Sequence, residues 1–301
     1  MACLKQDIVA KVNESGYNEH CIMTVRDVVE AVSRIKSGKQ DGYLGLSSDH
    51  VKHACHELFI HLSMLFTALI VHGSVTDDLS TSTVLPIPKG KKLNYSDSSN
   101  YRGIALSSIL GKIFDSYVLN RYDSILTSSN LQFGFKTSYS TSMCSMILKE
   151  TLEYYRRNKS TVYCTMLDAT KAFDRVEYCK LVRLLLKKNV PPIIIRILLH
   201  MYLLHFANVS WNGSSSCSFR VLNGVRQGAI LSPILFCVYF DTLVTSLAIT
   251  GLGCHIGSFF VGALAYADDL VLLAPSANAI IIIILIRNRV HKQFRCKKQS
   301  Y

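Results

Sequence analysis

The sequence is poor in charged residues and lacks the paired cysteines of a structural zinc site. Only 18% of its 301 residues are charged, whereas 49% are hydrophobic, so the chain is less charged than an ordinary soluble domain. Its ten cysteines include no Cys-x-x-Cys pair, the spacing that zinc sites commonly use. No basic and then apolar leader opens the chain, which argues against secretion. We therefore expect reduced thiols in an intracellular protein of the nucleus or cytoplasm.

A hydrophobic run long enough to span a membrane is also missing. The most apolar stretch, Ile280 to Ile286, is too short, because a bilayer requires about 20 apolar residues. Extending the stretch upstream to Phe259 would place Pro275 and a pair of aspartates in lipid, where adjacent carboxylates are very costly. We expect no membrane span here, and interpret the region as two buried strands followed by an atypical tail.

Positive charge predominates among the charged residues. Lys and Arg number 33 against 21 Asp and Glu, which gives a formal net charge of +12. An excess of this size suits a polyanionic partner such as nucleic acid. Composition alone leaves open a basic protein that has no such partner.

The periodicity of apolar residues predicts a mixture of helices and strands without an internal repeat. Helices are expected over residues 25–35, 48–72, 107–126, 143–158, 180–188, 193–205 and 232–247. Strands are expected over residues 84–88, 161–167, 207–211, 218–222, 259–266 and 270–274. The pair Asn212-Gly213 predicts a turn between two of these strands. The chain is therefore expected to be α+β.

Three carboxylates stand at the ends of apolar segments. Asp168 follows the strand expected over residues 161–167, and Asp268 and Asp269 lie at the tip of the last expected hairpin. Burying ionised carboxylates is costly without a partner, and neither Lys nor Arg adjoins Asp268 or Asp269 in the sequence. Oxygen ligands suit magnesium, so a divalent cation is a natural partner. The alternative is a pair of solvated turn aspartates.

Two metal ions held by such carboxylates could activate an attacking hydroxyl and stabilise a leaving phosphate. This chemistry requires carboxylates from separate strands that meet at one end of a sheet. Because neighbouring residues of a strand point to opposite faces, Asp268 and Asp269 should differ in role. We expect Asp268 to be the main partner of Asp168.

Six segments, in order along the chain, resemble the motifs of reverse transcriptases. Tyr266-Ala267-Asp268-Asp269 resembles their YxDD box, and the stretch from Asp168 to Asp174 resembles their DxxxAFD motif. The other segments resemble the GxxQGxxxSP motif and three further motifs, and they cover residues 223–233, 85–89, 100–106 and 132–135. The resemblance extends over about residues 25–275 and is strongest to non-LTR (LINE-like) retrotransposons of the jockey and CR1 kind.

This resemblance implies a polymerase right-hand fold with an antiparallel palm sheet packed on helices. Residues 1–80 would form a helical extension and the start of the fingers, 81–160 the fingers, and 161–275 the palm with the carboxylates. After Ala274 the resemblance stops, and residues 276–301 are interpreted as an aberrant tail, first apolar and then basic. A thumb is therefore expected to be missing.

The resemblance also implies a role for each matched acidic or aromatic residue. Asp168 and Asp268 would bind two Mg²⁺ ions, with Mn²⁺ as a possible substitute, and Asp269 would assist. Phe173 would act as a steric gate, since an aromatic ring beneath the sugar would clash with a 2′-hydroxyl. Simple core packing is the alternative for Phe173.

Basic and amide side chains would bind the nucleotide. Lys89 and Arg102 would contact the triphosphate, where cations neutralise charge during phosphoryl transfer. Gln227 and Gly228 would contact the incoming nucleotide and the template, the glycine allowing close backbone approach. Arg226 could contact the template or stabilise this loop, and the sequence does not decide between the two.

The expected function is that of an RNA-directed DNA polymerase from a retrotransposon. It would use an RNA template, a DNA primer and deoxynucleoside triphosphates, and without a thumb it would have little or no activity alone. The alternative is a non-catalytic nucleic-acid-binding remnant of a mobile element. The sequence does not specify an oligomeric state.

Overall fold

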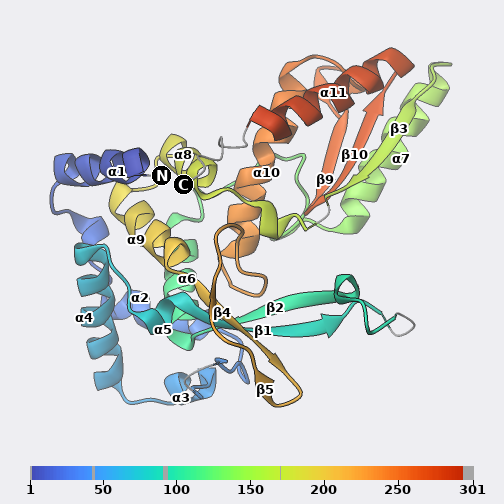
Figure 1. The fold of residues 1–301 in the computed structure, drawn as a ribbon. Helices are drawn as coiled ribbons and strands as arrows, with labels where there is room; N and C mark the ends of the chain where they lie inside the picture. The colour runs from blue at the N-terminus through green and yellow to red at the C-terminus, as the bar shows by residue number, and fades with distance from the viewer. Residues whose placement is uncertain (1, 43–44, 91–93, 170, 294–301) are drawn as a thin grey trace. The chain divides into compact units, whose positions relative to one another are not determined.

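The computed structural model describes residues 2–42, 45–90, 94–169 and 171–293. The chain folds into two compact units, each of which mixes helices and strands (Figure 1). Unit 1 comprises residues 1–126 and 173–232, and unit 2 comprises residues 127–172 and 233–301. Lys91 and Lys92, which follow Lys89 in a basic segment of the sequence, and the last eight residues of the expected tail lie outside the described residues.

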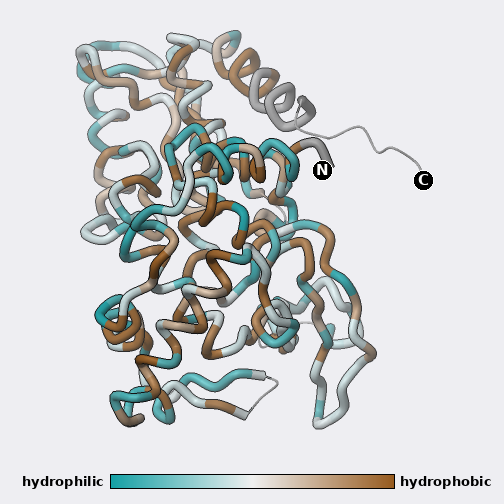
Figure 2. Tube along the Cα trace, turned by 90° about the vertical axis from the view of Figure 1, so that its left-hand side faces the viewer, coloured by the Kyte–Doolittle hydropathy of each residue, from teal (hydrophilic) through white to brown (hydrophobic). Residues whose placement is uncertain are grey.

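Apolar and polar stretches alternate along the chain, as the hydropathy colouring of Figure 2 shows.

In unit 1 the helices are α1 (Ala2–Ser15), α2 (Val25–Arg34), α3 (Ser48–Lys52), α4 (His56–His72), α5 (Asp77–Ser80), α6 (Ile109–Tyr122), α8 (Tyr178–Lys187) and α9 (Pro192–Leu203). Short 3₁₀ turns cover Glu19–Cys21, Ser98–Asn100 and Phe173–Arg175. The single helix expected over residues 48–72 is thus two helices, α3 and α4.

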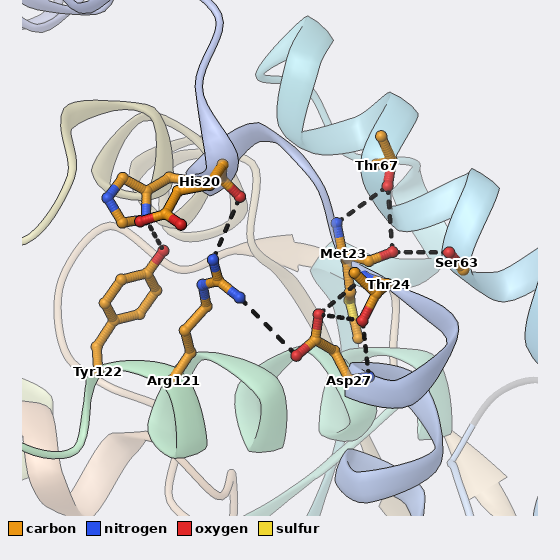
Figure 3. Close-up of polar contacts among 9 residues, drawn as sticks. His20, Met23, Thr24, Asp27, Ser63, Thr67, Arg121 and Tyr122 are labelled. Atoms are coloured by element: carbon orange, nitrogen blue, oxygen red, sulfur yellow. Dashed lines mark hydrogen bonds and ion pairs between the residues drawn. The ribbon is translucent and has the colours of Figure 1, made fainter.

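Polar contacts fix the start of α2 against α4 and α6 (Figure 3). The backbone N–H of Met23 donates to the Thr67 hydroxyl at 3.1 Å, and its carbonyl accepts from the Ser63 hydroxyl at 2.7 Å. From α6, the Arg121 guanidinium lies 3.9 Å from the Asp27 carboxylate. These contacts join segments about 40 and 95 residues apart in the sequence. They therefore help to hold α2 against α4 and α6 in the helical part of unit 1.

The sheet of unit 1 has the strand order β2-β1-β4-β5, with β6 also paired to β4. Its strands are β1 (Thr81–Pro88), β2 (Tyr101–Ser107), β4 (Phe206–Trp211), β5 (Ser214–Ser215) and β6 (Phe219–Arg220). β1 is antiparallel to β2 along its length and parallel to β4 only over Thr81–Val84. Pro86 and Pro88, which cannot donate a ladder hydrogen bond, lie beyond the part that pairs with β4. The Asn212-Gly213 turn is confirmed, with φ angles of 47° and 78°.

Unit 2 contains a three-stranded antiparallel sheet in the order β3-β10-β9. These strands are β3 (Tyr163–Asp168), β9 (Ala263–Tyr266) and β10 (Asp269–Ala274), and a small hairpin is formed by β7 (His255–Ile256) and β8 (Phe259–Phe260). The helices are α7 (Thr141–Arg157), α10 (Ser232–Ile249) and α11 (Ala277–Gln293).

Helices cover both faces of this sheet because its central strand is apolar on both sides. Leu270 and Leu272 pack in one core with residues of α10 and α11. Leu273, on the alternate face, packs in a second core with residues of α7. The apolar residues 161–167 predict a buried strand, but β3 is an edge strand in which no residue is buried and Met166 is 73% exposed, so that prediction is wrong.

The region expected to be an aberrant tail is a helix that belongs to unit 2. α11 begins at Ala277, and Ile280 and Ile283 join the core formed by α10 and the sheet. These two residues are three apart, the spacing that places side chains on one helix face. The interpretation of residues 276–301 as an aberrant tail is therefore corrected for its apolar part, which forms a packed helix.

One helix among the described residues, α10, is long and apolar enough to cross a membrane by length and composition alone. Leu243, Val244 and Leu247 of this helix are buried against the sheet of unit 2. A buried core helix meets the same criterion, so the finding is weak evidence for a span.

The packing of α11 predicts different effects for two adjacent isoleucines. Ile283→Ala should lower the free energy of unfolding by about 2–5 kcal/mol, since it leaves a cavity in the core. Ile282→Ala, at a side chain that is 43% exposed, should change it by about 0.5 kcal/mol or less. Urea unfolding measures both variants, and equal effects would contradict the docking of α11.

Candidate catalytic site

The Tyr-Ala-Asp-Asp segment forms the tight turn between β9 and β10. Tyr266 ends β9, Asp269 begins β10, and the two residues are paired across the hairpin. Ala267 and Asp268 form the turn, and Ala267 has a φ of 55°. This left-handed conformation costs a non-glycine residue roughly 1–2 kcal/mol, so other contacts must hold the turn.

The first carboxylate lies beside this turn. In the pairing of β10 with β3, Asp269 is directly opposite Asp168. Directly opposed residues of an antiparallel pair have their Cα atoms about 4.5–5.5 Å apart and their side chains on the same face. Both aspartates are exposed at this end of the sheet, and Asp268 is half-buried in the turn. Residues from separate parts of the sequence are therefore brought together, with Asp269, and not Asp268, opposite Asp168.

The donor chemistry of these carboxylates fits a hard divalent cation, which prefers oxygen ligands. Within the described residues, no three His, Cys, Asp or Glu side chains form a group spaced to hold a metal ion. The strand register places two of these carboxylates directly opposite each other, with the third in the adjoining turn. The backbone therefore brings the three aspartates to one end of the sheet, but their carboxylates do not converge on one point.

The Gln132 side chain holds this turn by hydrogen bonds to its backbone. Its carboxamide oxygen accepts from the backbone N–H groups of Ala267 and Gly134, at 2.9 and 2.8 Å, and its Nε2 donates to the Ala267 carbonyl at 3.1 Å. The backbone of Phe133 also donates to the Ala265 carbonyl at 2.8 Å. Because Gln132 is fully buried, these bonds hold the strained Ala267 in place without competition from water.

Gly134 is required by the same close approach. A Cβ atom at this position would lie 2.3 Å from the backbone nitrogen of Ala267, which no side chain tolerates. The segment Gln132 to Phe135 had been matched to a motif without a role. Its role as a positioning element for the Asp268 turn could not be found from the sequence, because the contact joins residues 135 positions apart.

In unit 1, the glutamine of the GxxQG segment contacts the segment that follows the first carboxylate. Gln227 Nε2 donates to the Asp174 carboxylate at 3.1 Å, and the backbone of Val225 donates to the Phe173 carbonyl at 2.9 Å. Phe173 itself is half-buried. The segment that carries Gln227 is thus bonded to the segment that carries Phe173 within this unit.

Gly228 lies against the strand β2. The backbone N–H of Ala105 donates to the Gln227 carbonyl at 2.6 Å. Gly228 has a φ of 114°, and a Cβ atom there would lie 2.8 Å from the Ala105 carbonyl oxygen. The close backbone approach expected of this glycine is therefore made to the protein's own strand.

Arg226 stabilises the motif loop, which decides between the two alternatives left by the sequence. It is only 6% exposed, and its guanidinium donates to the carbonyls of Leu79 at 3.3 Å and Met201 at 3.2 Å. Asp115 of α6 accepts from the Leu231 backbone N–H at 3.4 Å. Arg226 and Asp115 both line a cavity of about 10 Å³, about the space of one water molecule.

The two basic residues predicted to bind triphosphate lie on the β1–β2 hairpin. Arg102 is exposed and paired with Ile87 across the hairpin. Lys89 is also exposed, and its ammonium group donates to the Ser99 carbonyl at 2.8 Å. Lys89, Arg102, Phe173, Gln227 and Gly228 thus belong to unit 1, and the three aspartates to unit 2.

Comparison with known proteins identifies the family. A sequence profile described as reverse transcriptase (RNA-dependent DNA polymerase) matches residues 87–297. The chain belongs to this family. The match continues past Ala274, where the sequence resemblance was expected to stop, and it includes α11. This extension agrees with the core position of Ile280 and Ile283.

Relatives of this reverse transcriptase chain come from mobile elements. It is 26% identical to the RNA-directed DNA polymerase from mobile element jockey of Drosophila funebris, over 84% of this chain and 28% of the relative. It is 27% identical to the Pol polyprotein of an R2 element of Nasonia vitripennis, over 73% of this chain and 21% of the relative. The chain therefore spans less than a third of either relative.

A solved structure of apo telomerase from Candida Tropicalis, truncated from its C-terminal domain, is also similar to the reverse transcriptase chain. The TM-score is 0.49 at 14% sequence identity, over 84% of this chain and 56% of that one.

The hydrogen bonds from Gln132 to the turn predict that Gln132→Leu will reduce the protection of nearby backbone amides from hydrogen exchange. The substitution leaves the buried backbone groups of Ala267 unpaired, at about 1–3 kcal/mol for each group. Hydrogen exchange of the Ala267 and Gly134 amides should accelerate correspondingly. Gln6→Leu, at an exposed position of α1, is the control and should leave both rates unchanged, and slow exchange in Gln132→Leu would contradict the clamp.

The buried carboxyl of Asp115 predicts a pH dependence of stability. Burial raises its pKa from 3.8 to about 6, although the Arg226 charge and the bond from Leu231 act in the opposite direction. The folded state then keeps a proton that the unfolded chain releases, so stability should fall as pH rises from about 4 to 6 and level off above.

Urea unfolding of the wild type and Asp115→Asn across this pH range measures the effect. The free energy of unfolding of the wild type should fall by roughly 3 kcal/mol relative to that of Asp115→Asn as the pH rises. A difference that does not vary with pH would show that Asp115 has an ordinary pKa in the folded protein.

Proposed function

We propose that this chain is the RNA-directed DNA polymerase domain of a non-LTR retrotransposon. The observation that carries the proposal is the register of β3 with β10, which pairs Asp168 with Asp269 beside the Asp268 turn. Carboxylates brought from separate strands to one sheet end are what nucleotidyl transfer with two metal ions requires. Membership of the reverse transcriptase family supports the same chemistry.

Asp168, Asp268 and Asp269 would hold Mg²⁺ or Mn²⁺ in this domain. Bound there, two such ions supply Lewis-acid stabilisation of the attacking and leaving oxygens. The protein's own contribution is to fix where the carboxylates lie. The β3–β10 ladder sets Asp168 against Asp269, and Gln132 fixes the turn that carries Asp268.

The residues of unit 1 would bind the deoxynucleoside triphosphate. Lys89 and Arg102, both on the β1–β2 hairpin, would neutralise phosphate charge. Gln227 is held in place by Asp174, and its neighbour Gly228 by the packing against Ala105. Phe173 would serve as the gate that excludes ribonucleotides. In this proposal residues 81–160 supply the fingers and residues 161–275 the palm of a right-hand fold.

The partners would be an RNA template and a DNA primer. The net charge of +12 supports a polyanionic partner. The compartment we propose is the nucleus or cytoplasm, which the lack of Cys-x-x-Cys pairs in the sequence does not contradict.

Primer extension on an RNA template with deoxynucleotides and Mg²⁺ tests the proposal. Asp168→Asn and Asp268→Asn should each reduce incorporation by roughly 100- to 1,000-fold, because each removes charge that stabilises the transition state. Glu150→Gln, an exposed carboxylate of α7, is the matched control and should retain wild-type activity.

Two results would contradict the proposal. The first is incorporation that survives both aspartate substitutions. The second is a wild-type chain that binds primer–template but adds no nucleotide with either Mg²⁺ or Mn²⁺, which would favour a non-catalytic nucleic-acid-binding role.

A further inference from the structure

A single backbone position organises the loop that carries Gln132. Residues 128–136, which we call the Gln132 loop, lie between α6 and α7 and belong to unit 2. The Ser129 carbonyl accepts from the Gln132 backbone N–H at 3.1 Å and from the Lys136 ammonium group. Lys136 also donates to the Ser128 carbonyl at 2.8 Å. Ser129 therefore fixes the backbone from which the Gln132 side chain reaches the turn.

A carboxylate of α10 anchors this loop. Asp241 Oδ1 accepts from the Ser129 backbone N–H at 2.9 Å, although the two residues are 112 positions apart in the sequence. Leu243 and Val244, which follow Asp241 on α10, pack in one core with residues of β9 and β10. A hydrogen bond to an ionised acceptor is stronger than a neutral one. Asp241 thus joins the Gln132 loop to the helix that supports the strands of the candidate site.

Lys136 places a positive charge in the same region. Its ammonium group lies 4.9 Å from the centroid of the Tyr139 ring, an arrangement that stabilises a cation. Burial raises the pKa of the Cys237 thiol to about 12, while Lys136 acts to lower that pKa and Asp241 acts to raise it. The Cys237 Sγ also donates to the Gly134 carbonyl at 3.5 Å. Side chains of α10 therefore bind the loop both before and after Gln132.

An unbroken series of hydrogen bonds leads from Asp241 to the turn of the candidate site. Asp241 binds the N–H of Ser129, and the carbonyl of Ser129 binds the N–H of Gln132. The Gln132 carboxamide in turn binds the N–H and the carbonyl of Ala267. Ala267 precedes Asp268 and has a φ of 55°, a conformation that persists only where neighbouring contacts impose it. Movement of the loop would therefore release the residue next to Asp268.

We propose that Asp241 is a positioning residue for the reaction, because through Ser129 and Gln132 it fixes the turn that carries Asp268. This inference rests on the proposed function only for the role of Asp268 in catalysis. The carboxylate of Asp241 serves as a hydrogen-bond acceptor and takes no part in the chemistry. Asparagine offers a carbonyl oxygen in the same place, whereas alanine offers no acceptor.

Hydrogen exchange of the full chain, without metal or nucleic acid, tests this series of bonds directly. Asp241→Ala should accelerate exchange of the Ala267 and Gly134 amides by roughly 10-fold, as expected for the loss of one charged hydrogen bond. The Leu273 amide, which donates to the Gly262 carbonyl at 2.9 Å in the same unit, should exchange at the wild-type rate. Asp241→Asn should protect all three amides as the wild type does.

Two results overturn the inference. One is equal acceleration of the Ala267 and Leu273 amides in Asp241→Ala, which marks a general loss of stability. The other is unchanged exchange of the Ala267 amide in that variant. Glu150→Ala, at an exposed carboxylate of α7, is the matched control and should leave every rate unchanged.

Lys136→Met provides a second variant should Asp241→Ala fail to fold. It removes the hydrogen bonds to the Ser128 and Ser129 carbonyls but keeps a side chain of similar length. Exchange of the Ala267 amide should accelerate as in Asp241→Ala, and Lys136→Arg, which retains donors, should keep it slow. Unchanged protection of Ala267 in Lys136→Met overturns the path through Ser129.

Primer extension measures the consequence for catalysis. Asp241→Ala should lower the rate at saturating deoxynucleotide by about 10- to 100-fold, since a small misplacement of a catalytic group has an effect of this size. It should also raise the Mg²⁺ concentration needed for half-maximal activity and leave the KM for deoxynucleotide unchanged. Asp241→Asn should restore most of the rate. A loss confined to that KM, or equal losses in the two variants, overturns the positioning role.

The two assays separate this inference from the catalytic proposal. If the wild type extends no primer, the catalytic proposal fails, whereas selective loss of protection at Ala267 in Asp241→Ala would still show that Asp241 fixes the turn. If the wild type extends primers and Asp241→Ala extends them equally well, the catalytic proposal stands and the positioning role is overturned.

Discussion

The pairing register of β3 with β10 is the constraint on which the candidate site depends. A strand has a side-chain period of two, so a slip by one residue would turn Asp168 to the opposite face from Asp269. The slip is prevented by burial, because Leu270 and Leu272 must face the core formed with α10 and α11. Hydrophobic packing on one side of the strand therefore decides where the carboxylates lie on the other.

Buried polar side chains also hold the two motif segments in place, the turn that carries Asp268 and the segment that carries Gln227 and Gly228. Gln132 satisfies the backbone of a turn that adopts a costly conformation. Arg226, which directly precedes Gln227, and Asp115 are buried beside one small cavity, and each binds backbone groups. Removing one partner of such a network leaves a buried group unpaired, which costs more than the bond contributes. The positions of the site residues are thus fixed by residues that do not belong to the site.

The sequence predicts the segments whose pattern is local. The Asn212-Gly213 turn, the extended Val84 to Pro88 stretch and the strand that ends at Asp168 all follow from short-range periodicity and turn chemistry. Isoleucine, in contrast, favours strands intrinsically, and the run from Ile280 forms a helix because the sheet offers a surface for one of its faces. The clamp by Gln132 and the burial of Arg226 depend on contacts between distant residues, which no local pattern encodes.

The partial pairing of β1 has a mechanical consequence. β4 accompanies β1 only as far as Val84, so the remainder of the β1–β2 hairpin is a two-stranded ribbon, which is only marginally stable by itself. The contact between the rings of Tyr101 and Trp211 reaches from β2 to β4 across this interval. Side-chain stacking there takes the place of the missing ladder, so whatever inserts between or covers those rings would also alter how stiffly the hairpin projects from the sheet.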